Sequence, residues 1–496
     1  MILLLMMSVA VLAACQADGL EGTDGIRGST PSPTATPIEI DPATAALEIS
    51  ATPIVQPTAT DEPKRLSSEG SLATEGPWLL VYSGGSLYAF NSDGTGQTKL
   101  LDEYVLRFST APSGGLISYI IDVELENDKD GLQLKLFDMH DQSVRLLTSL
   151  QNPAVLPSIE EDEYGDAAFQ AMRAIGSPRW SHDGTRFAFI GQIDGPSADL
   201  YMLSISNGEI IRLSDGPSQA YNPVWSPDDE FIFHNGVWNF GTGAGFNNAG
   251  SWAAKSDGSL MIETTGGIGT DSVVRWVEDH TFLMATWSQP CGSGRLRYVD
   301  LDSGSVDEIW AYAYDDLAYN ENSGQLVLIV PPDWEFCSDD QPTGVYLFDH
   351  LTAQPEKVSE QEFWAVHVDP RNQEMFLLED WDARLYQMGP SGEIDWIVDM
   401  PDNRPYFSLA SGFWAWYSGW GEDTGLWLGG LDDPGPELIY TGEVNDGIWS
   451  LDGRSFFFLN EEVNGLFRAE APEFEPELIS DMIEMESFTY LMWLRQ

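Results

Sequence analysis

The chain is poor in positive charge. It has 23 Lys and Arg residues against 79 Asp and Glu residues, which gives a formal charge of −56 at pH 7. So few cations could not neutralise the phosphates of a nucleic acid, nor hold the protein on an anionic lipid surface. We therefore expect no nucleic-acid partner and an acidic exterior that keeps the protein soluble.

Long hydrophobic runs are also missing, since the apolar stretch at residues 2–12 is too short to span a bilayer. It ends in Leu12-Ala13-Ala14-Cys15, which resembles the bacterial lipoprotein signal, although no Lys or Arg precedes it. The resemblance implies a signal peptide at 1–15, lipidation of Cys15, and a lipid-anchored, extracytoplasmic place in the bacterial cell envelope. An ordinary secretory signal with a coincidental cysteine is the alternative.

Residues 16–75 show no pattern of a packed domain. Between 29 and 63 they hold seven prolines and seven threonines, which stiffen the backbone and offer little that could pack. We expect a disordered, extended stalk between the lipid anchor and a folded domain at 76–496.

From about residue 76, short apolar runs alternate with Gly, Asp, Ser and Asn turns, and helical periodicity is almost absent. This pattern is typical of an all-β fold. A motif recurs in which Trp and Ser precede an Asp-rich turn and an apolar strand follows, as expected for a four-stranded antiparallel meander whose turn needs a positive φ. Three strong copies lie at 178–190, 223–233 and 448–459, and a weaker one at 274–284.

The copy at 223–229, Pro-Val-Trp-Ser-Pro-Asp-Asp, resembles the TolB-type β-propeller repeat, a relative of WD repeats. The resemblance covers about 76–496 and implies a single large β-propeller of four-stranded blades. Such propellers also precede the catalytic domain of prolyl-oligopeptidase-like peptidases, for which the repeats leave no room. By analogy with TolB alone, a sensor or assembly subunit of an envelope complex is a further alternative.

Eight units begin with first strands near 104, 178, 223, 273, 315, 364, 407 and 447. Three strands at 78–101 precede them and a lone strand at 487–494 follows. Because an open ring exposes unpaired strand edges, we expect the C-terminal strand to complete the first blade. That tally is nine; since propellers usually have four to eight blades, we predict about eight, within a range of seven to nine.

One segment, 159–175, predicts a short amphipathic helix ended by Gly176, with Phe169 and Met172 on its apolar face. It lies on a connection between blades. We expect a packed surface element, and the alternative is a lid or partner contact over the channel mouth.

Cysteines are scarce. If Cys15 is lipidated, Cys291 and Cys337 remain as an even pair in an exported protein. Both follow the second strand of adjacent blades, so equivalent loops would present them on one face. We predict a disulfide between them, with two free thiols as the alternative.

Histidines are scattered without metal-ligand spacing, and we expect neither a metal site nor a cofactor. No nucleophile elbow, phosphate loop or dinucleotide motif is present. A carboxylate pair suited to glycoside cleavage could exist in space, but the sequence does not single one out.

Tryptophan is abundant, with 18 residues. The repeat accounts for several, and Trp414 and Trp416 alternate onto one face of a strand that we expect to lie between blades. Trp334 and Trp420 fall in loops, where they are candidate binding residues for a sugar or a protein partner.

The sequence therefore predicts a monomeric, surface-anchored propeller without catalytic activity that binds a protein or peptide partner in the cell envelope through its loops. The alternative is a propeller that binds or cleaves glycans with loop tryptophans and paired carboxylates.

Overall fold

The computed structural model describes residues 64–65, 70–125, 129–151, 167–174, 178–240, 246–265, 270–287, 293–330, 343–351, 353–369, 372–399, 406–410, 413–418, 424–430, 437–481, 483 and 489–495. All of them belong to one compact unit, Pro63–Gln496.

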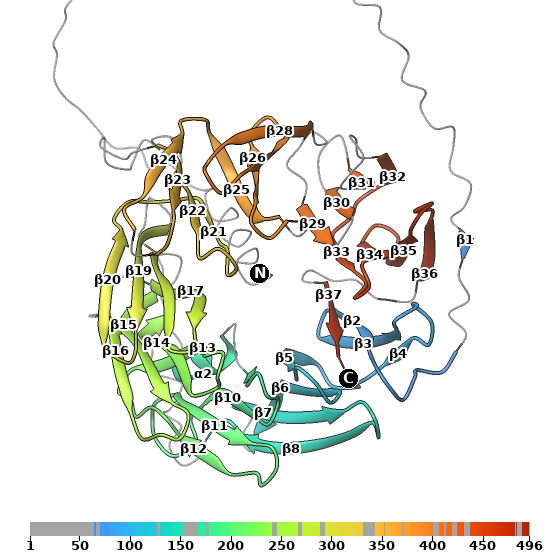
Figure 1. The fold of residues 1–496 in the computed structure, drawn as a ribbon. Helices are drawn as coiled ribbons and strands as arrows, with labels where there is room; N and C mark the ends of the chain where they lie inside the picture. The colour runs from blue at the N-terminus through green and yellow to red at the C-terminus, as the bar shows by residue number, and fades with distance from the viewer. Residues whose placement is uncertain are drawn as a thin grey trace, which may run out of the picture. The chain divides into compact units, whose positions relative to one another are not determined.

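Nine sheets, each built on four antiparallel strands, form a ring (Figure 1). We number these blades in chain order. Blade 1 comprises β37 (Tyr490–Leu494), β2 (Trp78–Ser83), β3 (Ser86–Asn91) and β4 (Thr98–Lys99); blade 2, β5 (Val105–Thr110), β6 (Leu116–Leu125), β7 (Lys129–Asp138) and β8 (Ser143–Ser149); blade 3, β9 (Arg179–Trp180), β10 (Arg186–Gly191), β11 (Asp199–Ser204) and β12 (Ile210–Arg212).

Blade 4 comprises β13 (Gln219–Trp225), β14 (Phe231–Phe240), β15 (Phe246–Lys255) and β16 (Met261–Thr265); blade 5, β17 (Thr270–Glu278), β18 (Thr281–Trp287), β19 (Ser293–Asp300) and β20 (Ser305–Trp310); blade 6, β21 (Asp316–Tyr319), β22 (Leu326–Val330), β23 (Gly344–Phe348) and β24 (Glu356–Ser359).

Blade 7 comprises β25 (Phe363–Val368), β26 (Phe376–Asp380), β27 (Arg384–Met388) and β28 (Ile394–Asp399); blade 8, β29 (Tyr406–Ala410), β30 (Phe413–Ser418), β31 (Gly425–Gly430) and β32 (Glu437–Thr441); blade 9, β33 (Asp446–Trp449), β34 (Ser455–Asn460), β35 (Gly465–Glu470) and β36 (Pro476–Ser480).

The predicted all-β propeller is thus confirmed. Its blade count is nine, the number that the strand tally gives and the upper end of the expected range. The predicted number of about eight is one too low, although it lies within the predicted range, because every unit with a degenerate motif still forms a complete meander.

The ring closes as predicted, because β37 from the C-terminus pairs antiparallel with β2 from Trp78↔Leu494 to Tyr82↔Tyr490. One further strand was not expected. β1 (Lys64–Arg65) pairs in parallel with β36 and makes blade 9 five-stranded.

The repeat motif builds the turn between the first and second strands. Ser226 donates its hydroxyl to Asp228 Oδ1 (2.7 Å) and accepts the main-chain N–H of Phe231 (2.9 Å), which holds the turn to the following strand. The turn requires a positive φ, which is 68° at Gly184 and 61° at Asp229. The same serine-to-aspartate bond recurs at Ser181 and Ser450.

The core lies between neighbouring blades. The middle strands are buried on both faces, as in β22 and β23, whereas the outer strand β8 is mostly exposed. The motif tryptophans cross these interfaces: Trp225 donates its indole N–H to the Arg179 carbonyl of blade 3 (3.0 Å), and Trp180 donates to the Ser109 carbonyl of blade 2 (3.1 Å). Aromatic area and a satisfied N–H therefore bind blade 4 to blade 3 and blade 3 to blade 2.

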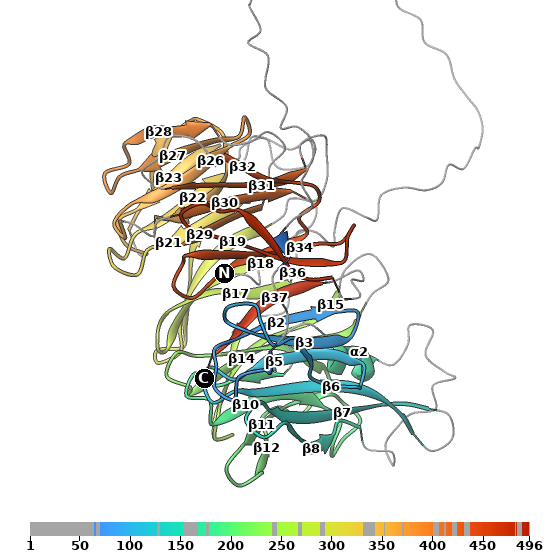
Figure 2. The same ribbon diagram turned by 90° about the vertical axis from the view of Figure 1, so that its right-hand side faces the viewer.

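One helix, α2 (Ala167–Arg173), occurs in the described part of the chain, within the predicted segment. Ala168, Ala171 and Met172 are buried and Phe169 is half-buried. The helix packs on β10, β13 and β14, which confirms the packed element (Figure 2). Within these ranges, no helix has the length and hydropathy needed to cross a membrane.

Candidate functional site

The two faces of the ring differ in their connections. Successive strands of each blade run antiparallel, so the link from one blade to the next and the connection between second and third strands lie at the same face. We call it the upper face. The motif turns, between first and second strands, lie at the lower face.

A hollow of about 230 Å³ opens between blades 3 and 4 at the upper face. We call it the Trp–His pocket. The link between the two blades forms one side, and β14, β15 and the start of β16 form the other. The lining residues are Ser214, Asp215, Gly216, Pro217, Ser218, Ala220, His234, Gly236, Trp238, Ala249, Trp252 and Met261.

Alternation along β14 builds this pocket. His234 and Gly236 are two residues apart, so they share one face of the strand, and Trp238 follows where the pairing with β15 is irregular. Trp252 pairs with His234 in the neighbouring strand, and the two rings stack with centroids 5.8 Å apart. A Cβ on Gly236 would come within 2.5 Å of the Trp252 ring. Glycine at this position therefore lets the indole lie across the strand.

His234 supplies a buried polar group to the pocket. Its side chain is 2% exposed, and its Nδ1 makes no hydrogen bond. Burial lowers the pKa of His234 to about 4, although the nearby Ile232 carbonyl opposes the shift. The ring is therefore neutral at physiological pH, and its Nδ1 is a buried polar atom without a hydrogen bond. Trp238, by contrast, is 52% exposed.

Asp199 holds the opposite wall in place. It is fully buried and accepts the main-chain N–H of Gly216 (2.9 Å), and it pairs with Arg212 (2.6 Å), which also binds Asp215 at the rim. Burial raises the pKa of Asp199 despite these partners. The link is thus fixed by a buried ion pair, so this wall is preformed.

A second, more polar hollow of about 360 Å³ lies on the upper face of blade 7. It is lined by Gln361, Glu362, Asp380, Trp381, Asp382 and Arg384. Asp380 is positioned by Tyr386, whose hydroxyl donates to Oδ2 (3.0 Å). Two hollows on one face therefore combine tryptophan with carboxylates.

The residues singled out from sequence, Cys15, Cys291, Trp334, Cys337 and Trp420, lie outside the described residues. In the sequence, Cys291 follows β18 and Cys337 follows β22, the second strands of adjacent blades. Both strands end at the upper face.

The prediction that Trp414 and Trp416 lie between blades agrees with their burial. Trp414 and Trp416 are buried, with rings 5.0 Å apart, as expected for residues between blades. His182, in the motif turn of blade 3, is 57% exposed, and its ring lies 2.9 Å from Asp229 of blade 4.

Sequence reasoning missed His234, Trp238 and Trp252, although the alternation of His, Gly and Trp along one strand was a usable signal. It also missed a group that could hold a metal ion, Asp228, Glu230 and His280. These side chains come from adjacent blades, so no local spacing shows them.

Comparison with known proteins does not show a family for this chain. No family model matches the chain. A curated relative, an uncharacterized peptidase YuxL of Bacillus subtilis (strain 168), is 47% identical over 55 residues, which are 11% of this chain and 8% of that protein. The match thus spans a small part of the relative.

Three solved structures are similar in fold. TolB from Acinetobacter baumannii is 12% identical over 64% of this chain and 62% of its own, with a TM-score of 0.29. Oligogalacturonate lyase from Vibrio parahaemolyticus is 12% identical over 73% and 99%, with a TM-score of 0.37. The propeller domain of the Trilobed protease from Pyrococcus furiosus is 10% identical over 77% and 98%, with a TM-score of 0.33. Function must therefore be argued from this chain's own residues.

Proposed function

We propose that this protein is a non-enzymatic, envelope-anchored propeller whose upper face binds a basic peptide or protein segment. The observation that carries the proposal is the Trp–His pocket, in which half-exposed Trp238 stands beside buried His234 with an unbonded Nδ1. Exposed tryptophan next to a preformed polar group is typical of a binding hot spot.

The size of the pocket favours one side chain of a partner. Its volume of about 230 Å³ is below the roughly 300–1,000 Å³ typical of small-molecule sites. A peptide that inserts one residue and extends over the rim matches that size.

Charge selects the kind of peptide. The formal charge of −56 attracts cationic segments and repels acidic ones. Trp238 and Trp252 offer aromatic faces to a guanidinium or ammonium group. We therefore propose a partner segment rich in Arg or Lys.

The test is binding of the full chain to an array of peptides that vary in net charge and aromatic content. We expect basic peptides to bind, and Trp238→Ala to weaken binding at least tenfold because it removes the exposed wall of the pocket. The matched control is Trp396→Ala, since Trp396 is 58% exposed but lies on outer strand β28 and lines neither hollow. Equal loss in both variants, or no preference for basic peptides, would contradict the proposal.

A glycan ligand is the second candidate. It is favoured by Trp381, which lies beside Asp380 and Asp382 in the polar hollow of blade 7. Neutral glycans fit the charge better than polyuronates, which the acidic chain would repel. A glycan array combined with a reducing-sugar assay separates binding from cleavage, and Trp381→Ala should abolish either one.

Anchoring is proposed from the lipoprotein-like signal at Cys15. Cys15→Ser should move the protein from the membrane to the soluble fraction of its host cell. Unchanged membrane association would contradict lipidation at this residue.

A further inference from the structure

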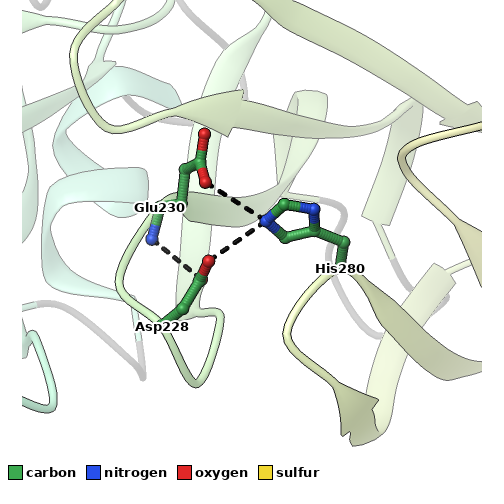
Figure 3. Close-up of side chains that lie close together, drawn as sticks. All are labelled: Asp228, Glu230 and His280. Atoms are coloured by element: carbon green, nitrogen blue, oxygen red, sulfur yellow. Dashed lines mark hydrogen bonds and ion pairs between the residues drawn. The ribbon is translucent and has the colours of Figure 1, made fainter.

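The lower face carries a cluster of side chains that joins blades 4 and 5 (Figure 3). Asp228 and Glu230 come from the motif turn before β14, and His280 comes from the corresponding turn before β18. His280 Nε2 lies 3.1 Å from Asp228 Oδ2 and 3.2 Å from Glu230 Oε2. Both carboxylates therefore converge on the same ring nitrogen.

The remaining polar atom of each side chain is held by a different partner. Asp228 Oδ1 accepts hydrogen bonds from the Ser226 hydroxyl (2.7 Å) and the Glu230 N–H (3.0 Å). Glu230 Oε1 pairs with Lys255 (2.5 Å), and His280 Nδ1 lies 2.8 Å from Asp302 Oδ1. Each side chain thus presents one fixed atom to a common point.

This arrangement is the one that metal ligands use. A ligating histidine commonly binds a carboxylate through its second nitrogen, which fixes the ring and raises its basicity, and ligating carboxylates are themselves hydrogen-bonded. Here Asp302 contacts the second ring nitrogen of His280. Ser226 and Lys255 bind the carboxylates of Asp228 and Glu230.

The charge of the cluster suits a divalent ion. Asp228, Glu230 and Asp302 carry three negative charges and Lys255 one positive charge, which leaves −2 when His280 is neutral. The three ligand atoms lie within 4.8 Å of one another, and the side chains are partly exposed. An ion can therefore reach the cluster from solvent.

We propose that Asp228, Glu230 and His280 form a binding site for a divalent transition-metal ion, and that Zn²⁺ is the ion that binds there most tightly. The imidazole nitrogen favours zinc over calcium or magnesium, which prefer oxygen ligands alone. Three protein ligands leave a coordination position for water. The bound ion ties blade 4 to blade 5 at the lower face, and none of its three ligands lines the Trp–His pocket.

The experiment measures metal binding to the full chain after treatment with a chelator, by equilibrium dialysis with Zn²⁺ and by the visible absorption of Co²⁺. We expect one site that is tighter than the binding of Ca²⁺ to the acidic surface. His280→Gln, which removes the single nitrogen ligand, should lower the affinity of this site at least 100-fold and remove the Co²⁺ band.

The matched control is His140→Gln, because His140 also lies beside a carboxylate (Asp138, 3.1 Å) but has no second one. This variant should bind Zn²⁺ like the parent chain. Asp302→Asn should weaken binding about 10- to 100-fold while the Co²⁺ band persists, as expected for a residue that positions the ligand.

Circular dichroism and melting confirm that each variant is folded. If His280→Gln does not fold, Asp228→Asn and Glu230→Gln make the same comparison, since each keeps the size of the side chain. A Zn²⁺ affinity equal in the parent chain and in every folded ligand variant would overturn the proposal and leave the cluster as an ion-pair link between blades.

Discussion

The carboxylate of Asp446, at the start of β33, accepts a hydrogen bond of 2.7 Å from the main-chain N–H of Leu491 in β37. The first strand of blade 9 is thereby tied to the strand that closes the ring. The same relationship joins blades 6 and 7, where Asp316 accepts the Val366 N–H (2.9 Å). In both cases burial outweighs the hydrogen bonds and raises the pKa of the aspartate to about 6.

These aspartates make stability depend on pH. Because their folded pKa of about 6 lies above the ordinary 3.8, the folded chain holds the proton more tightly than the unfolded chain. The stabilisation is complete below about pH 4 and is lost as the pH rises through 6.

Asp446→Asn should therefore melt at a higher temperature than the parent chain at pH 7, since it keeps an acceptor for Leu491 without a charge. The gain should stay below about 3 kcal/mol, because Asp446 is half-buried and solvent screens its charge. Melting curves from pH 4 to 8 measure the difference between the two chains. Asp141→Asn is the control, since Asp141 is exposed and Ser143 lowers its pKa. A constant difference across this range would argue against the buried charge.

Closure of the ring depends on β37. Besides its ladder with β2, Trp493 donates to the Trp449 carbonyl (2.7 Å), and Tyr490 stacks on Phe108 (5.8 Å). Deleting residues 485–496 removes these contacts and exposes two strand edges, so we expect aggregation or a loss of several kcal/mol. Static light scattering would measure the aggregation, and denaturant unfolding would measure the loss of stability. A truncated chain that melts like the parent would mean that the ring is stable without β37.

The indole hydrogen bond between blades can be isolated by comparing two tryptophans. Trp225→Phe leaves the Arg179 carbonyl without its partner and weakens the contact with Arg186, whose guanidinium lies 5.3 Å from the Trp225 ring. We expect a loss of about 1–3 kcal/mol in the free energy of unfolding. Trp276→Phe is the matched control, because Trp276 Nε1 is buried without a hydrogen bond, so its loss should be smaller. Urea unfolding measures the free energy of unfolding of both variants. Equal losses would show that the smaller phenylalanine ring, and not the missing hydrogen bond, causes the effect.

Asp229 occupies the position where two other copies of the motif have glycine. Its side chain is 5% exposed and accepts the main-chain N–H groups of His182 (2.7 Å) and Asp183 (2.8 Å) from blade 3. Asp229→Gly should therefore destabilise the chain by about 1–3 kcal/mol, although glycine suits the φ of 61° better. Asp229→Asn should be intermediate, since it keeps one acceptor. A gain in melting temperature for the glycine variant would show that backbone strain dominates.

The fold could be predicted from the sequence because each blade repeats a short pattern of apolar strands and turn residues. The motif at 223–229 marks a turn, and alternation in the flanking strands marks the buried faces. Blades 6 to 8 lack a clear motif, yet their strands begin within two residues of the expected positions at 315, 364 and 407. In these blades the apolar runs alone were sufficient to predict where the first strands begin.

The site could not be predicted, since it depends on which turns and links of adjacent blades meet. Alternation places His234 and Gly236 on one face of β14 but does not show that the link at 214–218 covers them. His280 likewise reaches Asp228 only because two motif turns lie side by side. Such contacts are set by the packing angle between blades, which a local pattern does not encode.

The last prediction concerns Cys291 and Cys337, which follow β18 and β22 in adjacent blades. Their separation in the chain is one blade length, so equivalent connections at the upper face would bring them together. A disulfide would restrict the unfolded chain by roughly 3–4 kcal/mol in the entropic account, and it requires Cα atoms within about 7 Å. Mass mapping of exported protein without reductant should show the two peptides joined, and Cys291→Ser should lower the melting temperature as much as Cys337→Ser or the double variant. Two freely alkylated thiols, or additive effects of the two substitutions, would refute the bond.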